Sequence, residues 1–237
     1  MKTVFIDCSP KQRLSASGFV ATFTRMFVFG RKVQCKLRTP KDFQPIFEEI
    51  KDADSIVFCM PLYVDGIPSH ILPFLKEMEN KFTNKNVYVI ANNGFIEGRQ
   101  NEPLMQNMEN FCHRANLNWC GGLGIGGGVM MNVMRIMFCV VCALSLLQVV
   151  LNGFDFSLLK DSLDDALVIL ILCCGIISFD LWLAYCINNG KEYGKHYTRI
   201  MLPSFVFIVC ADIFFTIISL FQGGIFRGWF SKKKPTM

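Results

Sequence analysis

The chain has 237 residues, a net charge of +5, a mean hydropathy of +0.36 and 52% hydrophobic residues. The length suits one ordinary domain with an added module, and the mild charge without a basic and aromatic patch argues against a nucleic-acid-binding protein. The apolar content is high for a soluble protein and concentrates after residue 128. We therefore expect a soluble domain at 1–128 and a hydrophobic helical membrane region at 129–237.

Cysteines and histidines constrain the compartment and the chemistry. The 11 cysteines are scattered through apolar runs, which is typical of free thiols in a reducing compartment. Cys139 and Cys142 have redox spacing, but within an apolar helical run we interpret them as packing residues. The histidines, His70, His113 and His196, are far apart, so no metal site is expected. The N-terminal apolar stretch is too short for a signal peptide, which predicts a cytoplasmic first domain.

Short apolar runs alternate with helical patterns over about the first 125 residues. The predicted strands are 3–8, 33–38, 55–59, 86–91 and 118–124. The predicted helices are 18–29, 42–51, 68–82 and 101–115. This alternation predicts an α/β fold with a parallel sheet covered on both faces. Five strands in this length predict a flavodoxin-like doubly wound sheet of order 2-1-3-4-5.

Ligands of such sheets bind beyond the carboxyl ends of the strands. After the first strand, "SPKQRLSASG" supplies hydroxyls and basic groups where a helix begins, which suits an anion or describes a plain helix cap with solvated charges. After the third, "MPLYVDGIPS" places Tyr63 between two prolines. After the fourth, "NNGFIEGRQNEP" contains Gly94 and Gly98, which allow close approach of the backbone to a ligand. Together the three loops predict a site for a phosphorylated planar ring.

Three segments carry a family resemblance: "VFIDCSPKQRLSAS", "SIVFCMPLYVDGIPSHILPFL" and "VIANNGF". Together they resemble the NADPH-dependent FMN reductase branch of the flavodoxin-like superfamily, over roughly 1–128. The resemblance implies FMN as cofactor, NAD(P)H as co-substrate, and a homodimer. The implied cofactor-binding residues are Ser9, Lys11, Ser15 and Ser17 for the phosphate, Pro61, Leu62, Tyr63 and Val64 along the isoalloxazine ring, and Asn92, Asn93 and Gly94 at its polar edge.

The chain departs from that family in two places. Gln12, Arg13 and Leu14 replace the usual glycine and asparagine of the phosphate loop. No cysteine cluster lies between the second and third strands, so no iron–sulfur cluster is implied. Because a flavin carries the redox chemistry itself, no catalytic acid or nucleophile is expected, and His70 and Glu97 are interpreted as structural or rim residues.

Two functions stay open. One is a membrane-anchored, NAD(P)H-dependent FMN oxidoreductase whose electron donor and acceptor the sequence does not name. The other is a cofactor-free flavodoxin-like binding or scaffolding module tethered to the membrane, because a fold does not fix a function. A dinucleotide fingerprint at Gly122, Gly124 and Gly127 is rejected, because the sequence about 20 residues further on, "ALSLLQVV", lacks the required acid. We interpret these glycines as the end of the fifth strand and a joint.

Three apolar segments follow, at 129–151, 166–187 and 203–226. Each approaches the ~20 residues that cross a bilayer, which predicts a multi-pass membrane protein in contact with lipid. Three crossings place the lysines of residues 232–234 outside the cell, against the positive-inside rule. Two crossings instead place 191–199 outside and make 129–151 a helix that covers the sheet. We expect three apolar helices, at least two of them spanning.

Asp180 and Asp212 lie inside apolar segments. An acid in such a place is by default a functional residue. The simpler interpretation, which we prefer, is a buried acid that pairs helices through a hydroxyl or through Arg135.

Overall fold

The computed structural model describes residues 1–11, 15–64, 66–152 and 159–221. It divides into two compact units, Met1–Met201 and Leu202–Met237. The strands of the first unit are β1 (Lys2–Asp7), β2 (Arg31–Lys36), β3 (Ser55–Pro61), β4 (Asn86–Asn92), β5 (Asn118–Gly126) and β6 (Gly194–Arg199). Its α-helices are α1 (Ala16–Phe27), α2 (Phe43–Lys51), α3 (Leu72–Met78), α4 (Glu102–Arg114), α5 (Gly128–Leu151) and α6 (Leu159–Asn189). The second unit contains α7 (Ser204–Phe221) within the third apolar segment, whose end lies outside the described residues together with the lysine tail.

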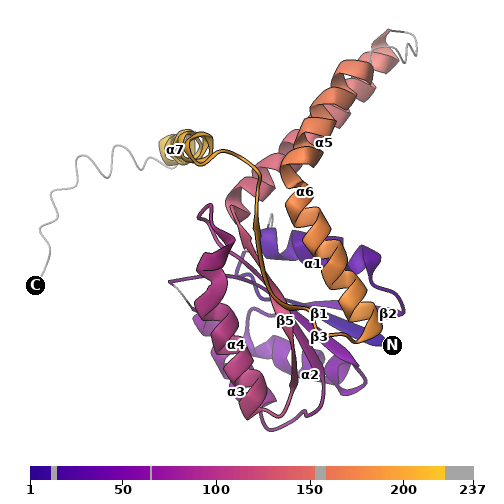
Figure 1. Cartoon of the computed structure of the whole chain (residues 1–237), viewed down its shortest axis with the longest axis vertical. Coiled ribbons are helices and arrows are strands. Elements are labelled where there is room, and N and C mark those ends of the chain that lie inside the picture. The colour runs from indigo at the N-terminus through magenta and orange to yellow at the C-terminus, as the bar shows by residue number, and fades with distance from the viewer. Residues whose placement is uncertain (12–14, 65, 153–158, 222–237) are drawn as a thin grey trace, which may run out of the picture. The chain divides into compact units, whose positions relative to one another are not determined.

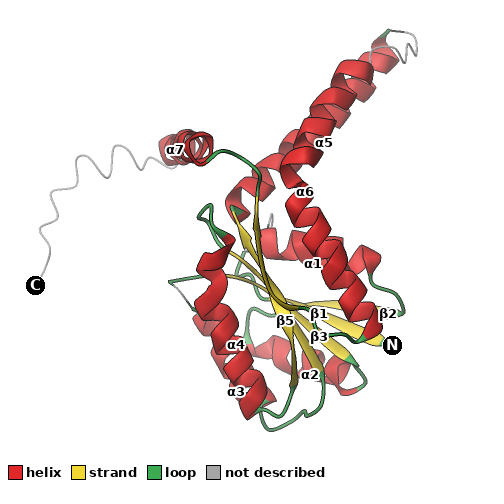
Figure 2. Cartoon of the chain, viewed as in Figure 1, coloured by secondary structure: helices red, strands yellow, loops and turns green. Residues whose placement is uncertain are grey.

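All strands pair in parallel in the order β2-β1-β3-β4-β5-β6 (Figure 2). The predicted flavodoxin-like arrangement 2-1-3-4-5 is confirmed as the first five positions of this order. The predicted strand count is wrong by one, because β6 extends the sheet beyond β5. Its sequence, GKHYTR, is polar and follows two apolar helices, so it was expected to be a loop between membrane segments.

The sheet is covered on both faces, and its strands show the period-2 pattern that this requires. Alternate residues of the central strands, such as Ile6, Phe58 and Val89, enter the large core beneath α2, α3 and α4. The residues between them face α1 and the C-terminal half of α6, which lie side by side on the other face (Figure 1). Buried Val57 and Tyr88 belong to this second face.

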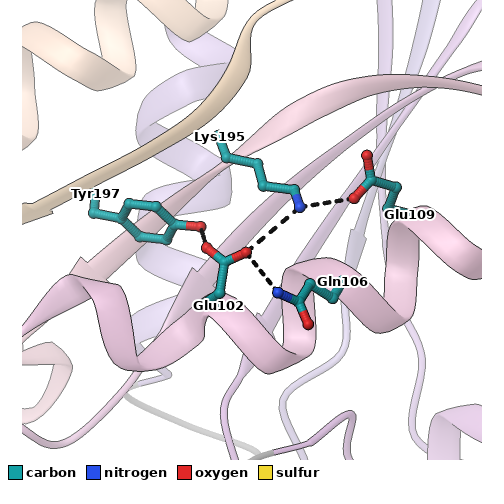
Figure 3. A network of polar contacts seen from close by, with 5 residues as sticks. All are labelled: Glu102, Gln106, Glu109, Lys195 and Tyr197. Atoms are coloured by element: carbon teal, nitrogen blue, oxygen red, sulfur yellow. Dashed lines mark hydrogen bonds and ion pairs between the residues drawn. The ribbon is translucent and has the colours of Figure 1, made fainter.

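β6 is held at the sheet edge by a polar network with α4 (Figure 3). The Tyr197 hydroxyl donates to the Glu102 carboxylate, and Lys195 Nζ lies 2.7 Å from Glu109 and 3.5 Å from Glu102. Gln106 also donates to Glu102 at 3.0 Å. Burial and the bonded Glu102 raise the pKa of Tyr197, and the bond from Tyr197 lowers the pKa of Glu102. Because β6 contacts α4 through these polar side chains, its sequence lacks the apolar run that would predict a strand.

α5 and α6 form an antiparallel hairpin that leaves the sheet and returns to it (Figure 1). The first turns of α5 are buried at Met130, Met131 and Met134. Farther along, Ser145 and Val149 are buried, but the large side chains from Ile136 onward are mostly exposed. The C-terminal half of α6 covers the sheet instead, with Leu183 and Ile187 fully buried. The alternative in which 129–151 covers the sheet is therefore wrong, and the first compact unit continues past the boundary predicted at 128.

This connectivity limits how the chain can cross a membrane. β5 precedes the hairpin and β6 follows it, and both strands lie in one sheet. The hairpin must therefore begin and end on the same side, so α6 cannot cross without α5. The two-crossing arrangement that combines α6 with α7 is excluded. Among the described residues, α5 and α6 are the helices that are long and apolar enough to span a bilayer.

The two acids of the apolar segments have different surroundings. Asp180 is fully buried, and Thr24 of α1 donates its hydroxyl to Asp180 Oδ1 at 2.7 Å. This is the hydroxyl-paired interpretation, with Thr24 rather than Arg135 as the bonded partner. Asp212 is exposed on α7 within its own unit.

Candidate functional site

The three loops predicted to bind a ligand meet at the carboxyl edge of β1, β3 and β4. Cys8 N–H donates to the Cys59 carbonyl at 2.8 Å, which ties the ends of β1 and β3. Leu62 N–H donates to the Asn92 carbonyl at 2.8 Å, which ties β3 to β4. The Ser17 hydroxyl donates to Asn92 Oδ1 at 2.7 Å and ties α1 to β4. The parallel strand order therefore brings the predicted site residues of 9–17, 61–64 and 92–94 to one place.

The first loop runs from Asp7 to the start of α1. Ser15 caps the helix, with its hydroxyl accepting the Gly18 N–H at 3.0 Å, and its side chain also bonds the Asp7 carboxylate. Ser9 Oγ accepts the Lys11 N–H at 3.3 Å, while Lys11 itself is exposed. Ser17 differs from the expectation for a phosphate ligand, because its hydroxyl is buried and donates to Asn92. Residues 12–14 of this loop lie outside the described residues.

Arg38, which follows β2, also belongs to this loop although no sequence pattern pointed to it. Its guanidinium donates to the Ser9 carbonyl at 3.2 Å and to the Lys11 carbonyl at 2.5 Å. Arg38, Lys36 and Arg135 line a cavity of about 300 Å³ beside Ser15 and Asp7. These cations come from three distant segments, so only the fold could bring them together. The resulting positive charge favours an anion at the start of α1.

Among the described residues that line this cavity, Asp7 is the one carboxylate, and it gives a prediction for pH dependence. Burial raises the pKa of Asp7 above its ordinary 3.8, although the Ser9 N–H and Arg38 lower it. The ionised carboxylate therefore destabilises the folded chain; this effect is complete above the folded pKa and disappears as the pH falls through it. We expect Asp7→Asn, which keeps an acceptor for Ser9, to raise the free energy of unfolding at neutral pH. Chemical denaturation between about pH 4 and pH 7 measures this. A variant less stable than the wild type at pH 7 would contradict the assignment.

The second loop presents an aromatic ring beside a strained residue. Pro61 is buried at the end of β3, Leu62 is half-buried, and Tyr63 is 42% exposed. Tyr63 and Gly66 bond each other through backbone N–H and carbonyl groups, which closes a tight turn. Val64 lies at the tip, fully exposed, with φ of +47°. A β-branched residue rarely adopts this left-handed conformation, and such strain is typical of ligand-binding loops.

The third loop leaves a buried acceptor without a partner. Asn92 and Asn93 are both buried, and Gly94 is exposed. Asn93 Nδ2 donates to the Glu97 carbonyl at 2.9 Å. Asn93 Oδ1 has no hydrogen-bond partner among the described residues. Since buried polar atoms are normally bonded, this oxygen is free to accept a hydrogen bond from a ligand.

His70 and Glu97 have the structural roles expected of them. The His70 Nε2 atom lies 3.1 Å from the Cys8 carbonyl oxygen, and this bond holds the loop after β3 against the end of β1. Glu97 contributes its backbone carbonyl to Asn93 and has an exposed side chain. The described residues of the three loops thus offer hydroxyls, N–H groups, cations and an aromatic ring, which is the chemistry of binding.

No protein-family model and no curated relative matches the chain. Several solved structures are similar in fold. The Trp repressor binding protein from Bacillus subtilis is 18% identical with a TM-score of 0.45, over 53% of this chain and 84% of that chain. An NADPH-quinone reductase from P. pentosaceus is 14% identical with a TM-score of 0.45, over 54% and 86%. The NAD(P)H:quinone oxidoreductase from Methanothermobacter marburgensis is 15% identical with a TM-score of 0.43, over 57% and 92%.

Proposed function

We propose that this chain is a membrane-anchored, FMN-dependent oxidoreductase that passes electrons or hydride from NAD(P)H or a protein donor to an acceptor near the membrane. The observation that carries the proposal is the carboxyl edge of the sheet, where the third loop leaves Asn93 Oδ1 buried and unpaired among the described residues and the first loop brings the Ser15 hydroxyl to the start of α1. A flavin mononucleotide offers a ring N–H to Asn93 Oδ1 and a phosphate to the start of α1. The motifs of the three loops, which resemble FMN reductases, support the same cofactor.

The residues present fit FMN, each with a distinct role. Ser9, Ser15 and Lys11 would hold the phosphate, with the N-terminus of α1 and Arg38 adding positive potential. Tyr63 would pack along the ring, and Asn93 would accept a hydrogen bond at its polar edge. The bound flavin supplies the hydride or electron chemistry, while the protein orients it and excludes water. Ser17 and Asn92 would support these groups through their mutual bond rather than contact the cofactor.

The α5–α6 hairpin is the proposed membrane anchor. Its outward part carries exposed large apolar side chains, such as Leu144, Leu147 and Ile171. Contiguous apolar surface of this kind marks a membrane or protein contact. The exposed part of α5 is about 16 residues, or roughly 24 Å, which is less than the ~30 Å hydrocarbon core. The sheet domain would therefore lie directly against a locally thinned membrane, on the cytoplasmic side.

A cofactor-free module is the second candidate, and two observations favour it. Ser17, one of the predicted phosphate ligands, is already bonded to Asn92. Arg38 bonds the carbonyls of Ser9 and Lys11, so the protein's own contacts position these two residues of the proposed phosphate loop. In that case the sheet domain would bind a partner near the membrane without redox chemistry.

Two variants at Ser15 test the phosphate site without removing the helix cap. Asp and Asn both cap helices about as well as Ser, so Ser15→Asp and Ser15→Asn should keep the stability of α1. Only Asp places a negative charge beside the phosphate. We expect Ser15→Asp to bind FMN at least about tenfold more weakly than Ser15→Asn, as measured by quenching of flavin fluorescence.

Riboflavin and a distant variant provide the controls. Riboflavin lacks the phosphate, so its binding should be nearly the same in both Ser15 variants. Thr83→Ala, at an exposed position before β4 and therefore near the opposite sheet edge, should leave FMN binding unchanged. Equal FMN affinity in folded Ser15→Asp and Ser15→Asn would reject the phosphate assignment.

A further inference from the structure

An apolar groove lies at the base of the hairpin, between α1, α5 and α6. Its volume is about 420 Å³, within the range of small-molecule sites. Its walls include Phe23, Phe138, Ile169 and Ile177 from the three helices. A groove with such walls suits a hydrocarbon chain.

The groove adjoins the basic cavity of about 300 Å³ beside β2. Phe19 and Arg135 line both of them, and the Arg135 guanidinium lies 4.9 Å from the centre of the Phe19 ring. The basic cavity also contains Lys36 and Arg38. Among the described residues, no carboxylate lies within 4.0 Å of these three cations. With Asp7 ionised, the four charged groups still sum to about +2.

The position of this pair of cavities relates it to the hairpin. Arg135 directly precedes the exposed apolar part of α5, which begins at Ile136. If the hairpin is inserted as proposed, Arg135 lies at the depth of the lipid headgroups, where arginine side chains commonly reach phosphates. The groove then opens beside the acyl chains and the basic cavity lies beside the headgroups.

We propose that the joined cavities bind one anionic membrane phospholipid, with its phosphate at Arg135, Lys36 and Arg38 and one acyl chain in the groove. The inference rests on the membrane insertion of the hairpin and not on the flavin. The lipid would tie α1 to the hairpin at the sheet end of the molecule. Ser15 also lines the basic cavity, so the lipid phosphate would lie close to the proposed position of the FMN phosphate and would compete with it.

A buried carboxyl group also lines the groove. Asp180 lines the groove, is fully buried, and leaves Oδ2 without a partner among the described residues. Its other oxygen accepts the Thr24 hydroxyl. A carboxyl group offers no positive charge to an anionic headgroup, whereas Arg135 does. The headgroup is therefore directed to the Arg135 end of the groove.

The test uses the full chain in detergent with three probes: lysophosphatidic acid, lysophosphatidylcholine of the same acyl chain, and inorganic phosphate. A ligand that binds the folded state raises the unfolding temperature in a concentration-dependent way. We expect lysophosphatidic acid to stabilise the chain at concentrations at least about tenfold lower than either other probe. Arg135→Gln should weaken this effect about tenfold, and Cys173→Phe, which fills the groove, should weaken it as well.

Lys41→Gln, at an exposed lysine after β2, is the matched control and should behave as the wild type. Riboflavin lacks the phosphate, so its binding should be unchanged in Arg135→Gln, which separates a failure of the lipid site from a failure of the flavin site. Equal stabilisation by both lysolipids would overturn the headgroup assignment. Equal stabilisation by phosphate and lysophosphatidic acid would overturn the role of the groove. If lysophosphatidic acid stabilises Arg135→Gln as strongly as the wild type, the proposed site is wrong. This holds also if a second copy of the chain, rather than a lipid, covers the hairpin.

Discussion

Replacing Gly121 by Ala is expected to detach β6 from β5 and to lower the free energy of unfolding by about 3 kcal/mol. Gly121 has φ of +114°, and an added Cβ would lie 2.2 Å from the Gly194 carbonyl oxygen and 2.4 Å from its nitrogen. Both obstacles are backbone atoms of β6, so no side-chain rotation can relieve them. Chemical denaturation measures the loss, and trypsin should cut more rapidly at Lys195, which lies within β6.

Gly66→Ala is the control for this substitution. A Cβ at Gly66 would meet only the Val64 carbonyl oxygen, at 3.8 Å, which is an ordinary contact. We expect a change below about 0.5 kcal/mol and unchanged proteolysis. Wild-type stability and protection of Lys195 in Gly121→Ala would mean that β6 is not a strand of the sheet. The limit on membrane crossing that follows from β6 would then be lost as well.

The double variant Leu144→Lys/Leu147→Lys should release the chain from membranes. Both leucines are on α5, 55% and 52% exposed, so the charges should not disturb the folded unit. A lysine at the centre of a membrane helix costs about 2.5–3.5 kcal/mol, so two of them oppose insertion strongly. The measurement is the fraction of chain that stays in membranes after an alkaline carbonate wash.

Leu72→Lys is a matched control on α3, because Leu72 is 50% exposed and lies outside the hairpin. It should remain in the membrane fraction. The released double variant should still bind FMN, since the hairpin and the three loops are different parts of the unit. Retention of the double variant in washed membranes would show that the hairpin is not the anchor.

The strands β1, β3 and β4 were predictable because they are buried on both faces and therefore appear as apolar runs. β6 was not predictable, since it is an edge strand whose Lys195 and Tyr197 bond to α4 through charge rather than apolar packing. That the C-terminal half of α6 covers the sheet could not be predicted from the sequence, for a related reason. A helix face buried on a sheet and a helix face exposed to lipid have the same composition, and only the connectivity separates them.

For the candidate site, too, local features could be predicted from the sequence, whereas contacts between residues far apart in the chain could not. The three loops could be predicted because their position at strand ends is a property of the local sequence. The bond from Ser17 to Asn92 joins residues 75 positions apart, so its effect on the proposed phosphate site was not visible in the sequence. The convergence of Lys36, Arg38 and Arg135 likewise depends on the path of α5 beside α1.

The flavin content of the wild-type chain tests the central proposal most directly. The detergent-purified protein is soaked with FMN, freed of excess by gel filtration, and its absorption spectrum is recorded against its protein concentration. The proposed function predicts flavin bands at near one FMN per chain. A folded chain that retains no flavin, with near-UV circular dichroism of packed aromatic residues, would contradict it and leave the cofactor-free membrane module.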